Sequence, residues 1–387
     1  MNTRASAITT HLCAGASIFY AARLAAFNAS WLELPLIERP RENAPFVSIV
    51  VPARDEERQI EDCVRSLLAQ EWLDFELIVV DDRSSDATNE ILQRIAFEDP
   101  RLRVVTGKAL PVGWVGKSWA LHQGSLEARA QWLLFTDADT RHDARSVASA
   151  LFWALEMGVD ALSLVTRQEL GSLAERAVLP SIFNMIMIAV GTLGAINDPK
   201  RPNAIVNGQY LMVRREAYEA LGGHVTLRRE IAEDLAFARH LKRDGRFRLS
   251  LAVGTQFASV RMYRSLREIW GGFSKNSFYG TDGSVLKLAG GIAFMLATSL
   301  APPVLAVRAL TRRRYVEAAE ALACTVATSV AAAWMAGRFH MPRRLGFFQP
   351  LGTAAFAAIM LDSAVRVLSG RGVAWRGRTY SGRPAPR

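Results

Sequence analysis

The hydrophobic pattern divides the 387-residue chain into a mixed central region and two apolar flanks. The first flank covers residues 5–27, and apolar segments dominate again after residue 284. In the middle, over roughly 45–265, short apolar runs alternate with charged, helix-like segments. This pattern predicts a globular domain, expected over 45–260, with membrane-associated helices before and after it.

Strands and helices alternate along the central region. Short apolar runs rich in β-branched residues are typical of buried strands, whereas an apolar period near 3.6 residues is typical of helices. We expect strands at 47–52, 75–82, 101–106 and 131–139, and helices at 58–71, 87–97 and 118–130. Because this alternation forms βαβ units, the sequence predicts an α/β fold with a mostly parallel, Rossmann-like sheet.

The N-terminal apolar stretch is long enough for a membrane anchor, expected within residues 1–30. It lacks a clear small-residue cleavage site, which argues against a removed signal peptide. His11 and Arg23 interrupt its apolar character, so the alternative is a surface helix packed on the domain.

Further apolar segments follow the central region, and each is long enough to span a bilayer: 286–307, 316–337 and 345–368. They predict transmembrane helices over 285–370, with a kink at Pro302-Pro303; the alternative is a soluble helical hairpin. The tail, 371–387, is basic and rich in Gly, Arg and Pro, so we expect its end to be disordered.

The net charge of +10 narrows the class of partner. A basic protein binds either nucleic acid or an anionic membrane surface. The arginines flank the apolar segments, as at Arg308, Arg312–Arg314, Arg338, Arg343 and Arg344, which favours the membrane. Zinc-finger spacing and RNA-binding aromatic signatures are absent from the sequence, so we expect no nucleic acid partner. Three scattered cysteines favour a reducing compartment.

Acidic residues stand where predicted strands end. Asp81-Asp82 ends the second strand, Asp137 and Asp139 end the fourth, and Glu233-Asp234 opens a later helical stretch. In parallel sheets ligands bind beyond the carboxyl ends of the strands. Converging carboxylates repel unless a cation joins them, and Mg²⁺ or Mn²⁺ prefers such oxygen ligands. At strand spacing Asp137 and Asp139 would point the same way; the alternative is that these acids cap turns.

Lys117 lies in the glycine-containing stretch GWVGKS. A lysine in such a loop can bind phosphate oxygens, which makes it a donor-binding candidate if the donor carries phosphates. The alternative is a solvated side chain, and the stretch lacks the spacing of a P-loop.

Several segments together resemble the catalytic domain of family 2 glycosyltransferases. They are VSIVVPARDEE (47–57), ELIVVDDRSSDAT (76–88), GKSWALHQG (116–124), LLFTDAD (133–139), VNGQYLMVRREAYEALGGH (206–224) and EDLAFARHLKRDG (233–245). The resemblance extends over about residues 45–280 and implies the GT-A nucleotide-diphospho-sugar transferase fold.

The resemblance also implies roles for single residues. Pro52, Asp81, Asp82 and Asp137 would bind the donor. Asp137 and Asp139 of the DxD site would hold the metal, and Asp234, beside Glu233, would be the catalytic base. In an inverting transfer the base takes the proton of the acceptor hydroxyl, while the metal acts as Lewis acid on the departing diphosphate.

The acceptor side is marked more loosely, by Asn207, Gly208, Gln209, His224, Arg261 and Arg264. By resemblance the turn at 207–209 lines the acceptor side, whereas His224 either faces the acceptor or ends a turn. Processive members carry a QxxRW motif, but here Ser265 stands where tryptophan would, which disfavours a polysaccharide synthase. RMYRSL and KNSFYG resemble instead the bacterial hopanoid-associated and carotenoid glycosyltransferases.

That subgroup implies a UDP-sugar donor and a lipid acceptor of isoprenoid, hopanoid, carotenoid or ceramide-like type. The segment 261–284 mixes aromatic residues with cations, which is typical of a helix at a membrane interface; the alternative is a core-packing helix. Two other classes stay open, a nucleotidyltransferase and an inactive membrane scaffold. The loop ARDEERQ after the first strand lacks the glycines of the former.

The membrane placement contains a conflict. Nucleotide sugars are cytosolic, so we expect the catalytic domain on the cytoplasmic side of a bacterial inner membrane. Three spans after that domain would place Arg308–Arg314 and the basic tail outside, against the positive-inside tendency. One segment is therefore expected to be re-entrant or interfacial, with 286–307 as the candidate.

Overall fold

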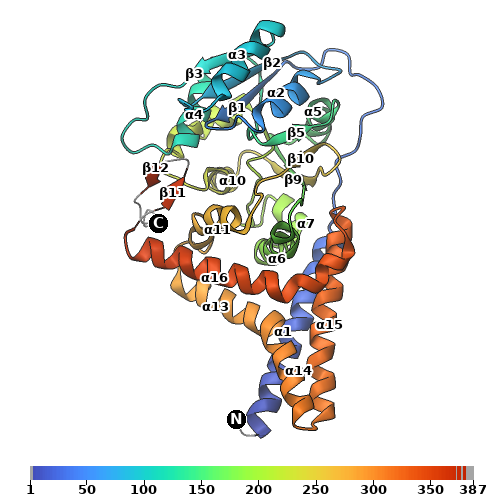
Figure 1. Ribbon diagram of the computed structural model, residues 1–387. Coiled ribbons are helices and arrows are strands. Elements are labelled where there is room, and N and C mark those ends of the chain that lie inside the picture. The colour runs from blue at the N-terminus through green and yellow to red at the C-terminus, as the bar shows by residue number, and fades with distance from the viewer. Residues whose placement is uncertain (1–2, 372, 376–377, 381–387) are drawn as a thin grey trace. The chain divides into compact units, whose positions relative to one another are not determined.

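The computed structural model describes residues 3–371, 373–375 and 378–380. The described chain divides into two compact units, each built from separated segments (Figure 1). One unit consists of 31–169 and 193–262, and is called the catalytic unit below; the other consists of the segments up to 30, 170–192 and from 263 onward, and is called the helical unit.

A seven-stranded sheet is the centre of the catalytic unit, as far as the structure describes it. Its strands, in spatial order, are β3 (Leu102–Thr106), β2 (Phe75–Asp81), β1 (Val47–Ala53), β4 (Trp132–Phe135), β8 (Leu211–Arg214), β6 (Ala161–Val165) and β9 (Leu249–Val253). Only β8 runs antiparallel to its neighbours within this sheet. The predicted α/β class with a mostly parallel sheet is therefore confirmed.

Helices cover both faces of this sheet because the side chains of a strand alternate between the faces. From β1, Ile49 and Val51 pack in a core with α2 (Ile60–Leu68), α3 (Thr88–Glu98) and α5 (Ser146–Met157). Val50 packs on the opposite face, in a core that includes α4 (Gly116–Glu127) and α10 (Glu233–Asp244). At Gly124 of α4 an added Cβ would lie 2.4 Å from Val50 Cγ1, so glycine allows α4 to approach the sheet closely.

Shorter elements complete the catalytic unit. A small sheet joins β5 (Thr140–His142), β10 (Ala258–Val260) and β7 (Arg167–Gln168). The short helices are α7 (Leu193–Asn197), α8 (Arg215–Ala220) and α9 (Gly223–Thr226). Because β5 begins directly after the DxD residues, this small sheet anchors the chain that leaves the site.

The helical unit contains two sets of helices that run crosswise to each other in Figure 1. The first set packs α1 (Thr3–Ala29), α14 (Ala301–Thr311) and α15 (Tyr315–Arg338) side by side. In the second set, α16 (Gln349–Leu368) packs against α6 (Leu173–Val190) and α13 (Val285–Met295). At Gly352 an added Cβ would lie 2.4 Å from the Ala177 carbonyl oxygen, which explains how α16 and α6 cross so closely.

The remaining elements of this unit are α11 (Leu266–Ser274), α12 (Ser277–Gly280), the π-helix Leu296–Leu300, the 3-10 helix Arg343–Phe348, and the hairpin β11 (Val373–Trp375) with β12 (Arg378–Tyr380). The π-helix ends at Leu300, and Pro302 and Pro303 follow in the first turn of α14, so the helix geometry changes next to the prolines at which a kink was expected and which lack backbone donors. The hairpin was not predicted, and the end of the tail, 381–387, lies outside the described residues.

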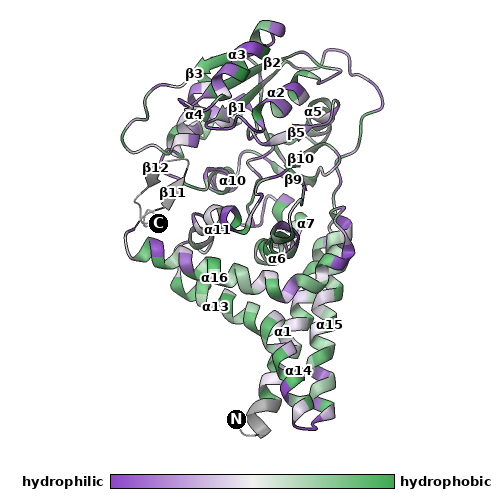
Figure 2. Ribbon diagram, in the orientation of Figure 1, coloured by the Kyte–Doolittle hydropathy of each residue, from purple (hydrophilic) through white to green (hydrophobic). Residues whose placement is uncertain are grey.

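Five helices in the described chain are long and apolar enough to cross a membrane, and they stand out in the hydropathy colouring of Figure 2. The sequence pattern predicted those near the N-terminus and after residue 284. It missed α6, which contains Pro180 and begins with a capping box between Ser172 and Glu175. The segment 261–284 forms two short helices rather than one, and Trp270 Nε1 donates to Asp362 Oδ2 of α16 at 2.8 Å.

Candidate active site

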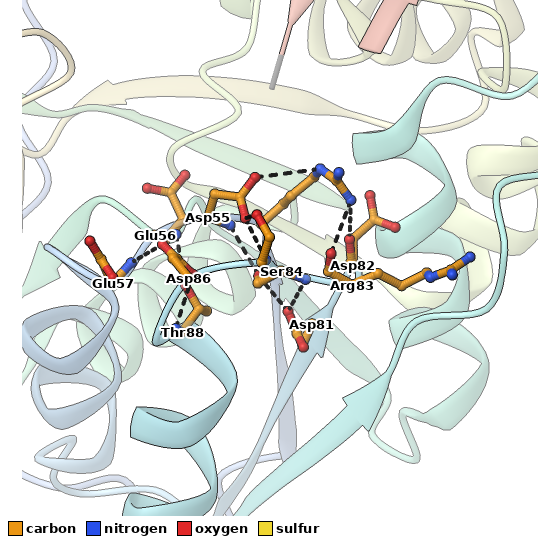
Figure 3. A network of polar contacts seen from close by, with 11 residues as sticks. Asp55, Glu56, Glu57, Asp81, Asp82, Arg83, Ser84, Asp86 and Thr88 are labelled. Carbon is orange, nitrogen blue, oxygen red and sulfur yellow. Dashed lines mark hydrogen bonds and ion pairs between the residues drawn. The ribbon is translucent and has the colours of Figure 1, made fainter. Parts of the chain in front are cut away.

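Two loops at the carboxyl ends of β1 and β2 interlock through reciprocal hydrogen bonds (Figure 3). The Asp55 N–H donates to Ser84 Oγ at 3.0 Å, and the Ser85 N–H donates back to Asp55 Oδ1 at 2.8 Å. Glu57 and the segment around Asp86 repeat the exchange, with the Glu57 N–H donating to Asp86 Oδ2 at 3.1 Å. These acids therefore order one continuous rim beside the sheet edge.

Asp81 is the last residue of β2, and its carboxylate is turned toward its own loop. Oδ1 accepts from the N–H and the hydroxyl of Ser84, at 3.1 and 2.5 Å, and Oδ2 accepts from Asn89 Nδ2 at 3.0 Å. Both Asp81 and Asp82 are nearly inaccessible to solvent. Their donor-binding role stays a prediction; the contacts of Asp81 show a carboxylate that orders the rim.

The DxD residues do not continue strand β4, which corrects the expectation of a strand to residue 139. The strand ends at Phe135, and Asp137-Ala138-Asp139 forms a turn in which the Thr140 N–H donates to the Asp137 carbonyl at 3.3 Å. The Thr136 N–H still donates to the Val50 carbonyl of β1 at 3.2 Å, and the hydroxyls of Thr136 and Thr140 bind carbonyl groups on either side of the turn. Ala138 is buried, while Asp137 and Asp139 on either side of it are partly exposed.

Lys117 connects the acidic clusters. From the first turn of α4 its Nζ lies 2.7 Å from Asp137 Oδ1 and 2.7 Å from Glu233 Oε1. Burial alone would lower the pKa of Lys117, but the surrounding carboxylates outweigh it and hold that pKa well above its usual value. The ammonium group is therefore charged and neutralises part of a concentrated negative charge.

Asp234 completes this group at the start of α10. Its Oδ1 accepts from the Leu235 N–H at 2.7 Å, and its Oδ2 accepts from the Gly208 N–H at 3.2 Å. Removal from water and the neighbouring Glu233 raise the pKa of Asp234 to about 6, against the opposing charge of Lys117. A carboxylate with that pKa is a stronger base at neutral pH than an ordinary one near 4.

Of the turn at 207–209, only the middle residue borders the charged group. Asn207 Nδ2 donates to the Leu164 carbonyl at 3.0 Å, and Gln209 Oε1 accepts from Thr166 Oγ1 at 2.5 Å, so both side chains bind the end of β6 and its extension. At Gly208 an added Cβ would lie 3.2 Å from both Asp234 Oδ2 and Lys117 Nζ. A glycine here keeps space open beside the candidate base.

The other predicted residues lie apart from this group or within the packing. His224 is buried, its Nδ1 is 2.8 Å from the Tyr218 hydroxyl, and burial lowers its pKa to about 3. Such a side chain packs the wall of the unit, so the structure gives its acceptor role no support. Pro52 lies in β1 opposite Val80, and Arg261 follows β10. Arg264 belongs to the helical unit, where its N–H donates to Glu268 Oε2.

Comparison with known proteins agrees with this geometry. Residues 48–222 match the sequence profile of Glycosyl transferase family 2. The chain carries a family 2 glycosyltransferase domain. Two curated relatives, the 4,4'-diaponeurosporenoate glycosyltransferases of Staphylococcus aureus strains MRSA252 and USA300, are each 26% identical over 88% of this chain and 89% of their own length.

A solved structure has the same fold along nearly the whole chain. The mannosyltransferase PcManGT from Pyrobaculum calidifontis, in complex with GDP-Man and Mn²⁺, has a TM-score of 0.54 and 21% identity. The match covers 94% of this chain and 98% of that one. It supports the GT-A fold expected for a glycosyltransferase.

The oxygen donors of the glycosyltransferase domain fit a hard divalent cation that shares its coordination with a diphosphate. Among the described residues, no group of three His, Cys, Asp or Glu side chains is placed to hold a metal alone. Mg²⁺ at phosphate sites needs no such cage, because one or two carboxylates, water and phosphate oxygens suffice. Asp137 and Asp139, both partly exposed on one turn, remain the predicted donor pair.

Residues of this site that the sequence reading missed are those whose role depends on tertiary contacts. Asp55 and Glu57 were noted only as an acidic loop, although they lock the rim. The signal available in the sequence was that polar residues two positions apart recur in both loops, Asp55 and Glu57 in the first and Ser84 and Asp86 in the second. Thr136, Thr140 and His142 beside the DxD turn were passed over, because threonine and histidine after a strand indicate no particular function.

Proposed function

We propose that this glycosyltransferase moves a sugar from a nucleotide-diphosphate donor to a lipid acceptor at the membrane, with inversion. The observation that carries the proposal is the charged group around Lys117, which joins Asp137 of the DxD turn to Glu233, next to Asp234. This group supports the proposal because its carboxylates suit a metal and a diphosphate, and because Asp234, with a pKa of about 6, suits proton removal near neutral pH.

The nature of the substrates is supported by the relatives. The curated relatives are named for glycosylating 4,4'-diaponeurosporenoate, and the described chain contains five helices apolar enough to cross a membrane. Both findings favour an apolar, carotenoid-like or other isoprenoid acceptor. The solved structure with GDP-Man and Mn²⁺ favours a nucleoside-diphosphate sugar with a divalent cation, Mg²⁺ or Mn²⁺. We infer a UDP-sugar from the family resemblance of the sequence alone.

Each group of the site has a defined task in this reaction. A cation held by Asp137 and Asp139 would supply Lewis-acid stabilisation of the leaving diphosphate. Asp234 accepts the proton of the acceptor hydroxyl, the hydroxyl oxygen bonds to the anomeric carbon, and the bond from that carbon to the diphosphate breaks. The electron pair of that bond leaves with the nucleoside diphosphate. Lys117 limits the repulsion among the carboxylates, and Gly208 leaves room for the hydroxyl.

The test is turnover by the full-length chain in detergent. With Mn²⁺, a panel of UDP- and GDP-sugars and isoprenoid or carotenoid alcohols as acceptors, mass spectrometry should detect the glycosylated alcohol. Asp139→Ala should lower the rate at least about 100-fold, because it removes a contribution of several kcal/mol. Asp143→Ala is the control, since Asp143 is exposed and follows the same turn. A wild-type chain without transfer or donor hydrolysis would instead favour the scaffold alternative.

The membrane topology follows from how the units are connected. Residues 169 and 193 both belong to the catalytic unit, so α6 begins and ends on the same side of the membrane. We therefore infer that α6 does not cross it, despite its apolar sequence. The helices α13 and α16 run crosswise to the α1, α14 and α15 bundle (Figure 1), which favours crossing by the bundle and an in-plane position for α13 and α16.

This arrangement removes the conflict raised by the arginines. If the π-helix and α14 together leave and α15 returns, then Arg338, Arg343 and Arg344 lie on the cytoplasmic side with the catalytic unit, in line with the positive-inside tendency. The tail after α16 stays there too. The turn at Arg312–Arg314 and the N-terminal end of α1 face the other side. In this arrangement α13 and α16 lie in the plane of the membrane. Of the segment 286–307, which was expected to be re-entrant or interfacial, only the part in α13 does so.

Reporter fusions test the topology directly. Alkaline phosphatase should be active when fused after Arg313, whereas green fluorescent protein should fluoresce when fused after His340 or after Ser369. The last fusion separates the models, because α16 would place it outside if it crossed. Phosphatase activity after Ser369 without fluorescence would show that α16 spans the membrane.

A further inference from the structure

A buried polar cluster lies directly behind the DxD turn, in the catalytic unit. It consists of Thr136, Thr140, His142, Ser146 and Tyr210, all of them buried. These residues come from the end of β4, from β5, from α5 and from the start of β8. Polar side chains in such a position are stable only when their hydrogen bonds are satisfied, so their contacts define which group donates to which.

The two threonine hydroxyls each have a carbonyl partner, and their oxygens also lie 3.0 Å from each other. Thr136 Oγ1 donates to the Gln209 carbonyl at 2.7 Å, and Thr140 Oγ1 donates to the Asp137 carbonyl at 2.7 Å. A hydroxyl carries one proton, so each threonine oxygen can serve any further contact as an acceptor only. His142 Nε2 lies 3.2 Å from the oxygen of Thr136 and 2.9 Å from that of Thr140.

It follows that His142 donates from Nε2 to both threonine oxygens. Its other nitrogen, Nδ1, lies 3.5 Å from Ser146 Oγ, a weak contact at most. Burial lowers the pKa of His142 to about 3, so the ring is neutral at physiological pH. The ring is therefore the neutral tautomer with its proton on Nε2, fixed by the groups around it.

We propose that His142 is a positioning residue which, through Thr140 and Thr136, fixes the Asp137 and Gln209 carbonyls relative to each other. The first carbonyl belongs to the DxD turn. The second belongs to the turn whose Gly208 N–H donates to Asp234. His142 thereby couples the donor side of the site to the candidate base from its buried position behind the DxD turn. Its importance for transfer rests on the function proposed above.

Three substitutions of His142 separate positioning from packing. In His142→Gln the amide nitrogen reaches the place of Nε2 and keeps the donor, whereas in His142→Asn it reaches only the place of Nδ1. His142→Phe keeps the ring volume without a donor. The residues around a metal ligand typically contribute about 10–100-fold to metal affinity or activity. We expect losses of that size for the Asn and Phe variants, and recovery of most of the loss with Gln.

The measurements are the Mn²⁺-dependent affinity for UDP and GDP, the kcat and KM for the donor, and the melting temperature. Positioning predicts weaker Mn²⁺-dependent nucleotide binding and a lower kcat in the Asn and Phe variants, at a melting temperature close to that of Gln. His240→Phe, on α10 and outside the cluster, is the matched control. The proposal is overturned if binding and kcat follow the melting temperature alone, or if Asn serves as well as Gln.

The tautomer can be tested without any activity. The ¹⁵N shifts of labelled histidine in the full chain should include an Nε2–H tautomer signal that is unchanged between about pH 5 and 8 and that vanishes in His142→Gln, while the signal of the other buried histidine, His224, remains. A Nδ1–H or titrating signal for His142 would refute the assignment. If the wild type binds no nucleotide, the proposed function fails, while this spectrum still decides the role of the histidine.

Discussion

Replacing Asp234 by asparagine should lower turnover by about 10²–10⁴-fold, the usual contribution of a general base, while donor binding changes little. The substitution keeps the shape of the side chain and an oxygen for the Gly208 N–H, but it removes the site that accepts the proton. Steady-state kinetics should therefore show a large fall in kcat. Calorimetric titration with nucleotide and Mn²⁺ should show nearly unchanged affinity.

The pH dependence provides a second test of the same carboxylate. Because the pKa of Asp234 is raised to about 6, kcat/KM should fall as the pH drops below that value and reach a plateau above it. The raised pKa also means that the folded chain binds this proton more tightly than the unfolded chain does. Stability linked to this group is then greatest at low pH and lost as pH rises through about 6, so Asp234→Asn should raise the melting temperature at neutral pH.

Asp244→Asn is the matched control on the same helix, because Asp244 lies at the exposed end of α10 and pairs with Arg246. It should leave kcat near that of the wild type. Normal turnover by Asp234→Asn would exclude Asp234 as the base. A loss of nucleotide affinity equal to the loss of kcat would instead assign it a role in donor binding.

Much of the sheet and of the acidic clusters could be predicted because both depend on local sequence. The run from Val47 to Pro52 is apolar and β-branched, and it forms β1 within one residue of the expected end. Asp81 and Asp234 were located by their places at the end of a strand and the start of a helix, which the structure confirms. Periodicity and element boundaries carry this kind of information.

What could not be predicted depends on contacts between distant segments. The turn at Asp137–Asp139 forms because Thr140 binds the Asp137 carbonyl, whereas the apolar run before it indicates only a strand. The helix α6 was missed because Pro180 interrupts its pattern, although the capping box at Ser172 is a recognisable start. The tautomer of His142 depends on hydroxyl partners 2–6 residues away and on Gln209, 67 residues further along the chain.

The role of Lys117 was the least accessible of these features, since a lone loop lysine is most simply solvated. In the structure it is 19% exposed and lies within ion-pair distance of Asp137 and Glu233, which are 96 residues apart. This arrangement shows why three carboxylates can share one side of the unit before a metal binds. The charge of the lysine is a structural requirement of the site as well as a candidate contact for the diphosphate.

Lys117→Met should therefore destabilise the protein strongly. Breaking a buried ion pair by removing one partner costs about 3–5 kcal/mol, and the residual exposure of Lys117 makes this an upper bound. Loss of the positive charge also raises the pKa of Asp234 further, so the acid limb of kcat/KM should move above pH 6. The melting temperature in detergent and the pH–rate profile measure the two effects. Lys108→Met, at an exposed lysine of the same region, should change neither.

A double-mutant cycle isolates the bridge from other consequences of the substitution. Glu233→Gln removes one of the carboxylates that Lys117 neutralises, so the double variant with Lys117→Met should be less destabilised than the sum of the single changes predicts. Additive losses would mean that Lys117 and Glu233 do not interact in solution. If the stability losses are non-additive but the acid limb of kcat/KM in Lys117→Met stays near pH 6, the lysine stabilises the site without affecting the pKa of Asp234. If the acid limb moves to higher pH, the same ammonium group both stabilises the cluster of carboxylates and lowers the pKa of Asp234, the proposed base.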